Sequence, residues 1–112
     1  MPLDSRSRSF TAVDQVSDHI QVSDAVSGIV GFQATGTCNV VLTPEATVNG
    51  TDWVGVLLVE GNTATAATTI TVSGSPATKL FRVDAGGYAL VRVKCSTHTS
   101  GTCVLRYYTA IG

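Results

Sequence analysis

Ala89-Leu90-Val91-Arg92-Val93-Lys94-Cys95 is followed by a polar bend over residues 96–101 and then by Cys103-Val104-Leu105-Arg106-Tyr107. Apolar side chains alternate with arginine or lysine in both runs, and successive side chains of a strand point to opposite faces. The pattern therefore predicts two half-buried strands joined as a hairpin. The residues expected to face inward are Ala89, Val91, Val93, Cys95, Cys103, Leu105 and Tyr107.

The same period of two extends towards the N-terminus. Short runs at residues 28–34, 38–43, 70–72 and 80–83 alternate in this way, and the last of them places Phe81 and Val83 inward and Arg82 outward. Glycine or proline separates most of these runs, for example at Gly36 and at Gly74-Ser75-Pro76. No window has the spacing of an amphipathic helix. Roughly eight short strands predict an all-β antiparallel sandwich of the jelly-roll kind.

Two features near the middle of the chain complete this prediction. Asn49-Gly50 is the strongest short hairpin signal, because both residues tolerate the positive φ of a tight turn. Residues 53–59, Trp53-Val54-Gly55-Val56-Leu57-Leu58-Val59, are apolar on both phases. We therefore expect this run to be a central strand.

The N-terminal residues differ from the rest. Serine alternates with arginine over residues 5–9, and there is nothing to bury before Phe10, so we expect residues 1–10 to form an extended arm ahead of one domain over residues 11–112. The arm either frays or becomes ordered on a partner. Gln15-Val16-Ser17-Asp18 recurs at residues 21–24, and this shift keeps Val16, Ile20, Val22 and Val26 on one face. It predicts one or two strands along an edge.

Composition limits the possible partners. Of 112 residues only 13% are charged, and 7 Lys and Arg stand against 8 acids, so the chain lacks the basic excess of a nucleic-acid binder. It has no apolar run of membrane-spanning length and no signal-peptide core at its start, so we expect neither membrane anchoring nor export. The low charge suggests that a partner covers part of the surface.

The residues suited to catalysis or metal binding do not form a recognisable motif. Cys38, Cys95 and Cys103 are an odd number without a CxxC pair and lie on inward phases, so we expect buried free thiols, although Cys95 and Cys103 could meet across the hairpin. His19 and His98 lack zinc-site spacing. Asp14, Asp18 and Asp24 are too spread for a calcium loop. We expect no catalytic residues, no metal and no cofactor.

Two stretches resemble a sandwich module of small structural proteins of tailed bacteriophage virions. They are Asn49-Gly50-Thr51-Asp52-Trp53-Val54-Gly55-Val56 and residues 80–94, followed by residues 96–102; the second contains Arg82-Val83-Asp84-Ala85-Gly86-Gly87-Tyr88. The resemblance covers roughly the C-terminal two thirds and implies a jelly-roll-like sandwich used for attachment. Cys95 and Cys103 depart from it, at positions usually small or β-branched, and leave open whether a disulfide forms.

For a chain of this size the resemblance implies a capsid decoration (cement) protein, located on the virion and assembled in the host cytoplasm. Its expected partners are the major capsid protein of the same virus and further copies of itself, as a dimer or trimer, without direct nucleic-acid contact. The alternatives are a head–tail, tail or baseplate accessory protein and a carbohydrate-binding host-attachment module. Two groups of residues are expected to contact the partner. Arg106 and Tyr108 are expected to do so because Arg and Tyr are favoured at interfaces. Arg6, Arg8 and Phe10 are expected to do so because the N-terminal arm would become ordered on the shell or on a neighbouring copy.

Overall fold

The computed structural model describes residues 4–24, 28–61 and 63–109. These residues form nine β-strands and one short 3-10 helix, and none of their helices is long and apolar enough to cross a membrane. The all-β class is therefore confirmed. In chain order the elements are β1 (Asp4–Phe10), β2 (Ile20–Gln21), η1 (Val22–Asp24), β3 (Ile29–Thr47), β4 (Val54–Gly55), β5 (Leu58–Glu60), β6 (Ala66–Ala67), β7 (Ile70–Asp84), β8 (Leu90–Gly101) and β9 (Cys103–Thr109).

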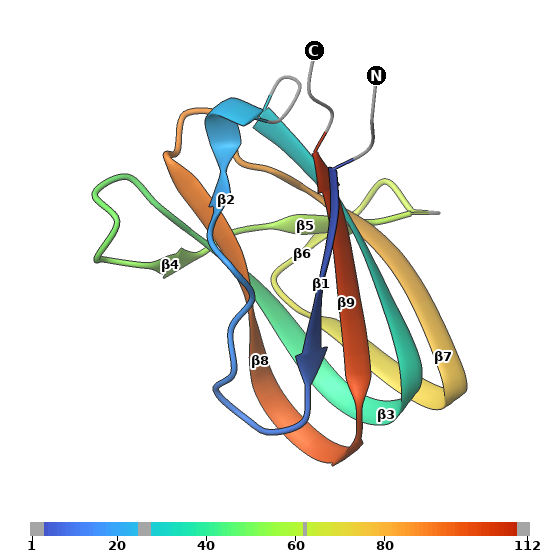
Figure 1. The fold of residues 1–112 in the computed structure, drawn as a ribbon. Coiled ribbons are helices and arrows are strands. Elements are labelled where there is room, and N and C mark those ends of the chain that lie inside the picture. The colour runs from blue at the N-terminus through green and yellow to red at the C-terminus, as the bar shows by residue number, and fades with distance from the viewer. Residues whose placement is uncertain (1–3, 25–27, 62, 110–112) are drawn as a thin grey trace.

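The strands form an antiparallel sandwich in which β3 and β7 belong to both layers (Figure 1). In the first layer the strand order is β1-β9-β3-β7-β5-β6. β3 contributes its residues 29–36 to this layer, and β7 contributes its residues 77–84. In the second layer residues 38–47 of β3 pair with β8, and residues 70–74 of β7 lie on their other side. β2 extends this layer beyond β8, and β4 pairs with the end of β3. The chain thus connects the layers through its longest strands.

Glycine marks the corner where the chain passes between the layers. Gly36 in β3 and Gly101 in β8 both have positive φ, at 143° and 76°. A Cβ on Gly36 would collide with the carbonyl oxygen of Thr102, and a Cβ on Gly101 with that of Thr37. Each strand therefore needs glycine where the backbone of the other passes it, because only glycine accepts such a close approach at these dihedrals.

This corner overturns the predicted C-terminal hairpin. β8 and β9 do not pair with one another; β8 pairs with residues 38–47 of β3 and β9 with residues 31–35. The polar bend at residues 96–101 belongs to a run that turns from the second layer into the first. The physical reason is that β3 supplies a long edge to which both halves of the run can bond.

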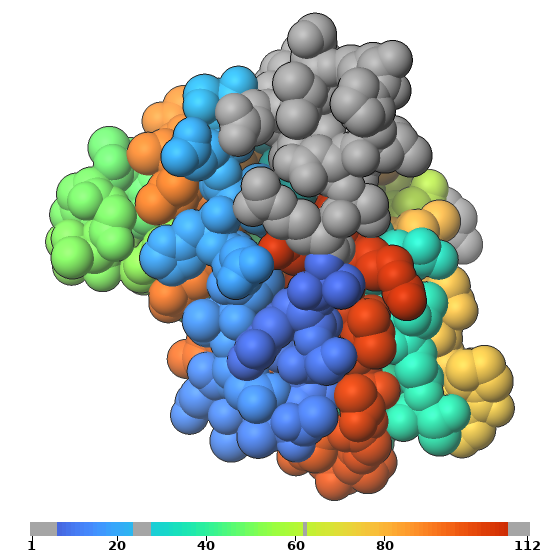
Figure 2. Space-filling view, viewed as in Figure 1, coloured from blue at the N-terminus to red at the C-terminus, as the bar shows by residue number. Residues whose placement is uncertain are grey.

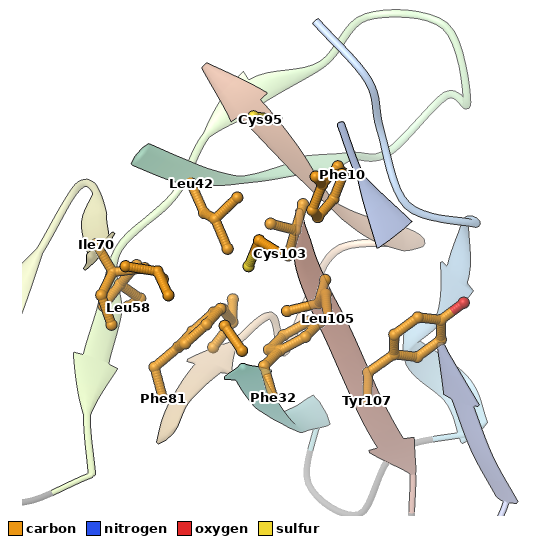
Figure 3. Packing of buried hydrophobic residues seen from close by; sticks show 14 of the residues in the cluster. Phe10, Phe32, Leu42, Leu58, Ile70, Phe81, Cys95, Cys103, Leu105 and Tyr107 are labelled. Carbon is orange, nitrogen blue, oxygen red and sulfur yellow. The ribbon is translucent and has the colours of Figure 1, made fainter. Parts of the chain in front are cut away.

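The core lies between the layers, where side chains from both meet (Figure 3). Val91, Val93 and Cys95 of β8 face Cys103, Leu105 and Tyr107 of β9 in one cluster, so their predicted inward phase is confirmed. The inward positions of Phe81 and Val83 and of Ile70 and Val72 are confirmed too. Ala89 is an exception, because it is exposed. It lies just before the start of β8, where its N–H donates a hydrogen bond to the carbonyl of Thr47.

Residues 53–59 do not form the predicted central strand. They give only β4 and the start of β5, and Val54 and Leu57 are exposed. Trp53 is half-buried: the Arg92 guanidinium lies 4.1 Å from its ring centroid, and the His19 ring centroid is 4.8 Å away. Continuous apolar character predicted burial on two faces, but the described strands leave Val54 and Leu57 uncovered.

The turn predicted at Asn49-Gly50 does connect paired strands, since β3 and β4 pair on either side of it. The loop is longer than a two-residue hairpin turn. The side-chain Oδ1 of Asn49 accepts hydrogen bonds of 2.9 Å from the backbone N–H groups of Thr51 and Asp52. The side chain of Asn49 thus accepts the hydrogen bonds of two loop N–H groups, as asparagine does in many turns.

The N-terminal segment is part of the sandwich. Residues 4–10, predicted as an extended arm, are extended but form β1, which pairs with β9 over its whole length. Residues 14–22 then follow the open edge of β8, with the N–H of Ser17 bonded to the Val93 carbonyl at 2.8 Å. Of the residues predicted to share one face of an edge strand, Ile20 is buried in β2, whereas Val22 is buried in η1 and not in a strand. Val16 is only half-buried, and Val26 lies outside the described residues.

Candidate functional site

All five residues predicted to contact a partner lie on β1 and β9, which run side by side (Figure 1). Arg6 pairs with Tyr107, Arg8 with Leu105 and Phe10 with Cys103. Since paired residues share a face of the sheet, the even-numbered residues of β1 occupy the same face as the buried residues of β9. Arg106 belongs to the opposite, outward face. The register therefore places Arg8 and Phe10 on one face of the sheet and Arg106 on the other.

Phe10 cannot contact a partner while the chain is folded. Its side chain is fully buried in the core, directly opposite Cys103. The prediction that Phe10 binds a partner is therefore wrong. The reason is that Phe10 ends β1 on the inward phase, where the apolar core takes it up.

Arg8 of β1 shares this inward phase. Arg8 is half-buried, and its Nε is buried without a hydrogen-bond partner among the described groups. The backbone of Arg6 is paired opposite Tyr107, but its side chain lies outside the described residues. The burial of Phe10 sets the phase of the strand, so its serines, such as Ser7 and Ser9, are the exposed residues.

Arg106 is exposed on the outward face of β9. Its Nη1 donates a hydrogen bond of 3.2 Å to the Thr35 hydroxyl of β3. This contact orients the guanidinium over the sheet and leaves its other N–H groups available. The backbone of Tyr108 pairs with Ser5 and with Gly31, whereas its side chain lies outside the described residues.

The structure adds residues that the sequence reasoning did not assign to a surface. Across β9, β3 and β7, Arg106 lies opposite Gln33 and Gln33 opposite Leu80, while Arg82 lies opposite Gly31. We call this outward surface the arginine face; it consists of Gly31, Gln33, Leu80, Arg82 and Arg106. Figure 2 shows β1, β9, β3 and β7 next to one another at the molecular surface.

The arginine face is hollowed at its centre. Its five residues line a depression of about 390 Å³, and a Cβ added to Gly31 would meet nothing within 4 Å. The absence of a side chain at Gly31 thus leaves a gap in the row that contains Arg82. Leu80 is 56% exposed beside it. An apolar side chain on the same surface as two arginines is a composition favoured at protein interfaces.

No described side chain forms an ion pair with the arginines of the arginine face. Elsewhere Lys79 pairs with Glu60 at 3.4 Å, Arg92 with Glu45 at 2.9 Å and Lys94 with Asp14 at 3.5 Å. Arg82 and Arg106 take part in no ion pair among the described side chains. The face is therefore suited to contact carboxylate or carbonyl groups of a partner.

The alternation of residues 80–83 already indicates that Arg82 and Leu80 share the outward phase. It does not indicate that Gly31, Gln33 and Arg106 lie beside them, since that depends on the register between strands distant in sequence.

The three thiols are free and buried, as predicted. Burial raises the pKa of Cys103 to about 12, and the neighbouring Cys38 contributes further. Burial also raises the pKa of Cys95, assisted by Asp14. A raised pKa keeps the thiol protonated and unreactive. No group of three or more His, Cys, Asp or Glu side chains in the described part of the chain could hold a metal ion.

Fold and surface together define an all-β antiparallel sandwich with a basic, hollowed outer face. Searches found neither a family model nor a curated protein that matches the chain. The crystal structure of the SPBc2 prophage-derived protein YomS is similar, with a TM-score of 0.71 and 10% identity over 98% of this chain and 96% of that one. A chain from the disulfide-linked pili of Bacillus endospore appendages has a TM-score of 0.40 and 21% identity, over 96% and 87%. The first similarity shows that this chain has the YomS fold over nearly its whole length.

Proposed function

We propose that this chain is a non-catalytic structural protein of a bacteriophage particle that decorates the outside of the capsid shell. The observation that carries the proposal is the fold shared with a prophage-derived protein over almost the whole length of both chains. The resemblance of residues 49–56 and 80–102 to a virion module supports it independently, because it rests on sequence and not on shape.

The arginine face would be the surface that contacts the major capsid protein. Arg106 would bind carboxylates or carbonyl groups of the shell, and Leu80 and the hollow over Gly31 would receive an apolar side chain. Each copy would bridge neighbouring shell subunits and resist the outward pressure of packaged DNA. Copies of the chain would also associate with one another. No cofactor and no nucleic-acid contact is needed for this role.

A head–tail, tail or baseplate accessory role is the second candidate, since the same fold and face would serve it. A carbohydrate-binding role has less support. Such a site needs an exposed aromatic platform, but Trp53 is covered by Arg92 and His19, and Tyr107 is buried. Among the described aromatic side chains only Tyr88 is exposed.

Co-sedimentation with empty shells of the virus that encodes the chain tests this proposal. Two variants alter the arginine face without touching the core: Arg106→Glu reverses a charge, and Gly31→Tyr fills the hollow, where an added Cβ has open space. Thr71→Glu and Thr71→Tyr introduce a negative charge and an aromatic ring at an exposed position of the second layer and serve as controls.

We expect the wild-type chain and both controls to bind saturably. Arg106→Glu and Gly31→Tyr should each lower the affinity for the shell by at least about tenfold. If the wild-type chain fails to bind, the decoration role is wrong. If all four variants bind like the wild-type chain, the arginine face is not the contact surface.

A further inference from the structure

A second exposed surface is apolar and lies around the connection between β3 and β4. Of the seven large hydrophobic side chains that are exposed in the described residues, five gather there, each between 42% and 70% exposed. We call them the apolar patch: Ile29, Val48, Val54, Leu57 and Tyr88. The loop that carries Val48 and Val54 stands out from the body in Figures 1 and 2.

The patch is continuous. Ile29, Leu57 and Tyr88 line a hollow of about 720 Å³, and Val48, Val54 and Tyr88 line a neighbouring one of about 400 Å³. Both hollows share Gly55, Val56 and Tyr88. Contiguous apolar surface is rare on soluble monomers and marks sites of association.

A strand edge adds to this surface. Among the described strands β4 pairs with β3 alone, so its second edge is open beside Val54. Open edges bind further strands through their unpaired N–H and carbonyl groups.

The charges at the patch identify the occupant. Arg82 and Asp84 lie two residues apart on the outward face of β7, and both line the larger hollow with Ile29 and Leu57. Neither takes part in an ion pair among the described side chains. A two-fold rotation places the positive charge of one copy opposite the negative charge of the second copy, and the reverse. An adjacent pair of opposite charges is therefore complementary to the same pair on a second copy.

We propose that the apolar patch is a dimer interface, at which two copies of this chain pack against each other about a two-fold axis. Arg82 of each copy faces Asp84 of the other, around a centre formed by Ile29, Leu57 and Tyr88. The proposal rests on the proposed function only in specifying the self-association included there. Its test uses no virus particles, so it can fail independently of shell binding.

Sedimentation velocity of the full-length protein over a range of concentrations measures the association. Leu57→Asp places a charge in the centre of the patch, and Val13→Asp, at a side chain 51% exposed outside the patch, is the control. Each substitution occurs twice in a two-fold dimer, so Leu57→Asp should raise the dissociation constant about a hundredfold. Val13→Asp should leave it unchanged.

Charge reversal tests the two-fold pairing itself. Arg82→Glu alone brings like charges together twice, and so does Asp84→Arg alone, so each variant should be monomeric where the wild-type chain is dimeric. An equimolar mixture of the two variants restores both opposite-charge pairs and should form heterodimers. Circular dichroism of each variant verifies that it is folded, since Asp84 also accepts a hydrogen bond from the Gly86 N–H at 3.1 Å.

Four results would overturn the proposal. The wild-type chain could remain monomeric at every concentration, or form trimers. Leu57→Asp could associate as tightly as the Val13→Asp control. The mixed charge variants could remain monomeric although both are folded.

Discussion

Replacing Phe10 by alanine tests whether the N-terminal segment belongs to the folded domain. Phe10 is the last residue of β1 and is fully buried opposite Cys103. If residues 1–10 were a detached arm, this substitution would leave the stability of the domain unchanged. In the structure it removes an aromatic ring from the core.

The size of the effect follows from burial. Burying a phenylalanine removes about 150–250 Å² from water, which at about 25 cal/mol per Å² is worth ~4–6 kcal/mol as an upper estimate. Measured Phe→Ala substitutions in cores cost about 3–5 kcal/mol. Since a domain of this size has a total stability of roughly 5–15 kcal/mol, the variant should lose a large share of it.

Urea unfolding followed by circular dichroism measures this loss, with Val13→Ala as the control. Val13 is 51% exposed, so its truncation should change the free energy of unfolding by less than about 0.5 kcal/mol. The melting temperature of Phe10→Ala should fall by roughly 12–20 °C. A loss below about 1 kcal/mol would refute the reasoning, because β1 would then be dispensable. Deletion of residues 1–10 should destabilise the domain at least as much as Phe10→Ala.

Two further predictions concern the thiols and the corner. The pKa of Cys103 is raised from 9.0 to about 12, so the folded state holds this proton more tightly than the unfolded state. Its contribution to stability is fully present below pH 9 and is lost as the pH rises towards 12; between these values the urea midpoint should fall more steeply for the wild-type chain than for Cys103→Ala. Equal slopes would contradict the assignment. At the corner, Gly101→Ala should cost at least about 2 kcal/mol more than Gly87→Ala, because both have positive φ but only the first Cβ meets a neighbouring backbone. Similar unfolding free energies for the two variants would rule out this account of the corner.

The alternation of apolar and charged residues was sufficient to predict the fold class and most of the core. Val91, Val93, Leu105 and Tyr107 are buried as expected, because the period of two in a strand reports directly which face is covered. The same rule places the serines of β1 outward once Phe10 is known to be buried. Treating Phe10 as part of a free arm, and not as the first core residue, is what misassigned it as a contact residue.

The path of the chain could not be predicted in this way. The bend at residues 96–101 reads as a hairpin loop, and only the backbone of Thr37 behind Gly101 shows that it is a corner. Such a contact joins residues distant in sequence, and a single sequence does not encode it locally. The arginine face has the same origin, since Gly31, Arg82 and Arg106 meet only through the register of three strands.

The number of copies of the chain in purified virus particles tests the decoration role most directly. Quantitative mass spectrometry against a major capsid protein standard gives this ratio without any variant. A decoration protein should be present in hundreds of copies, in fixed proportion to the shell subunits. Roughly six or twelve copies, as expected for a component of a tail with cyclic symmetry, or complete absence from the particle, would contradict the account.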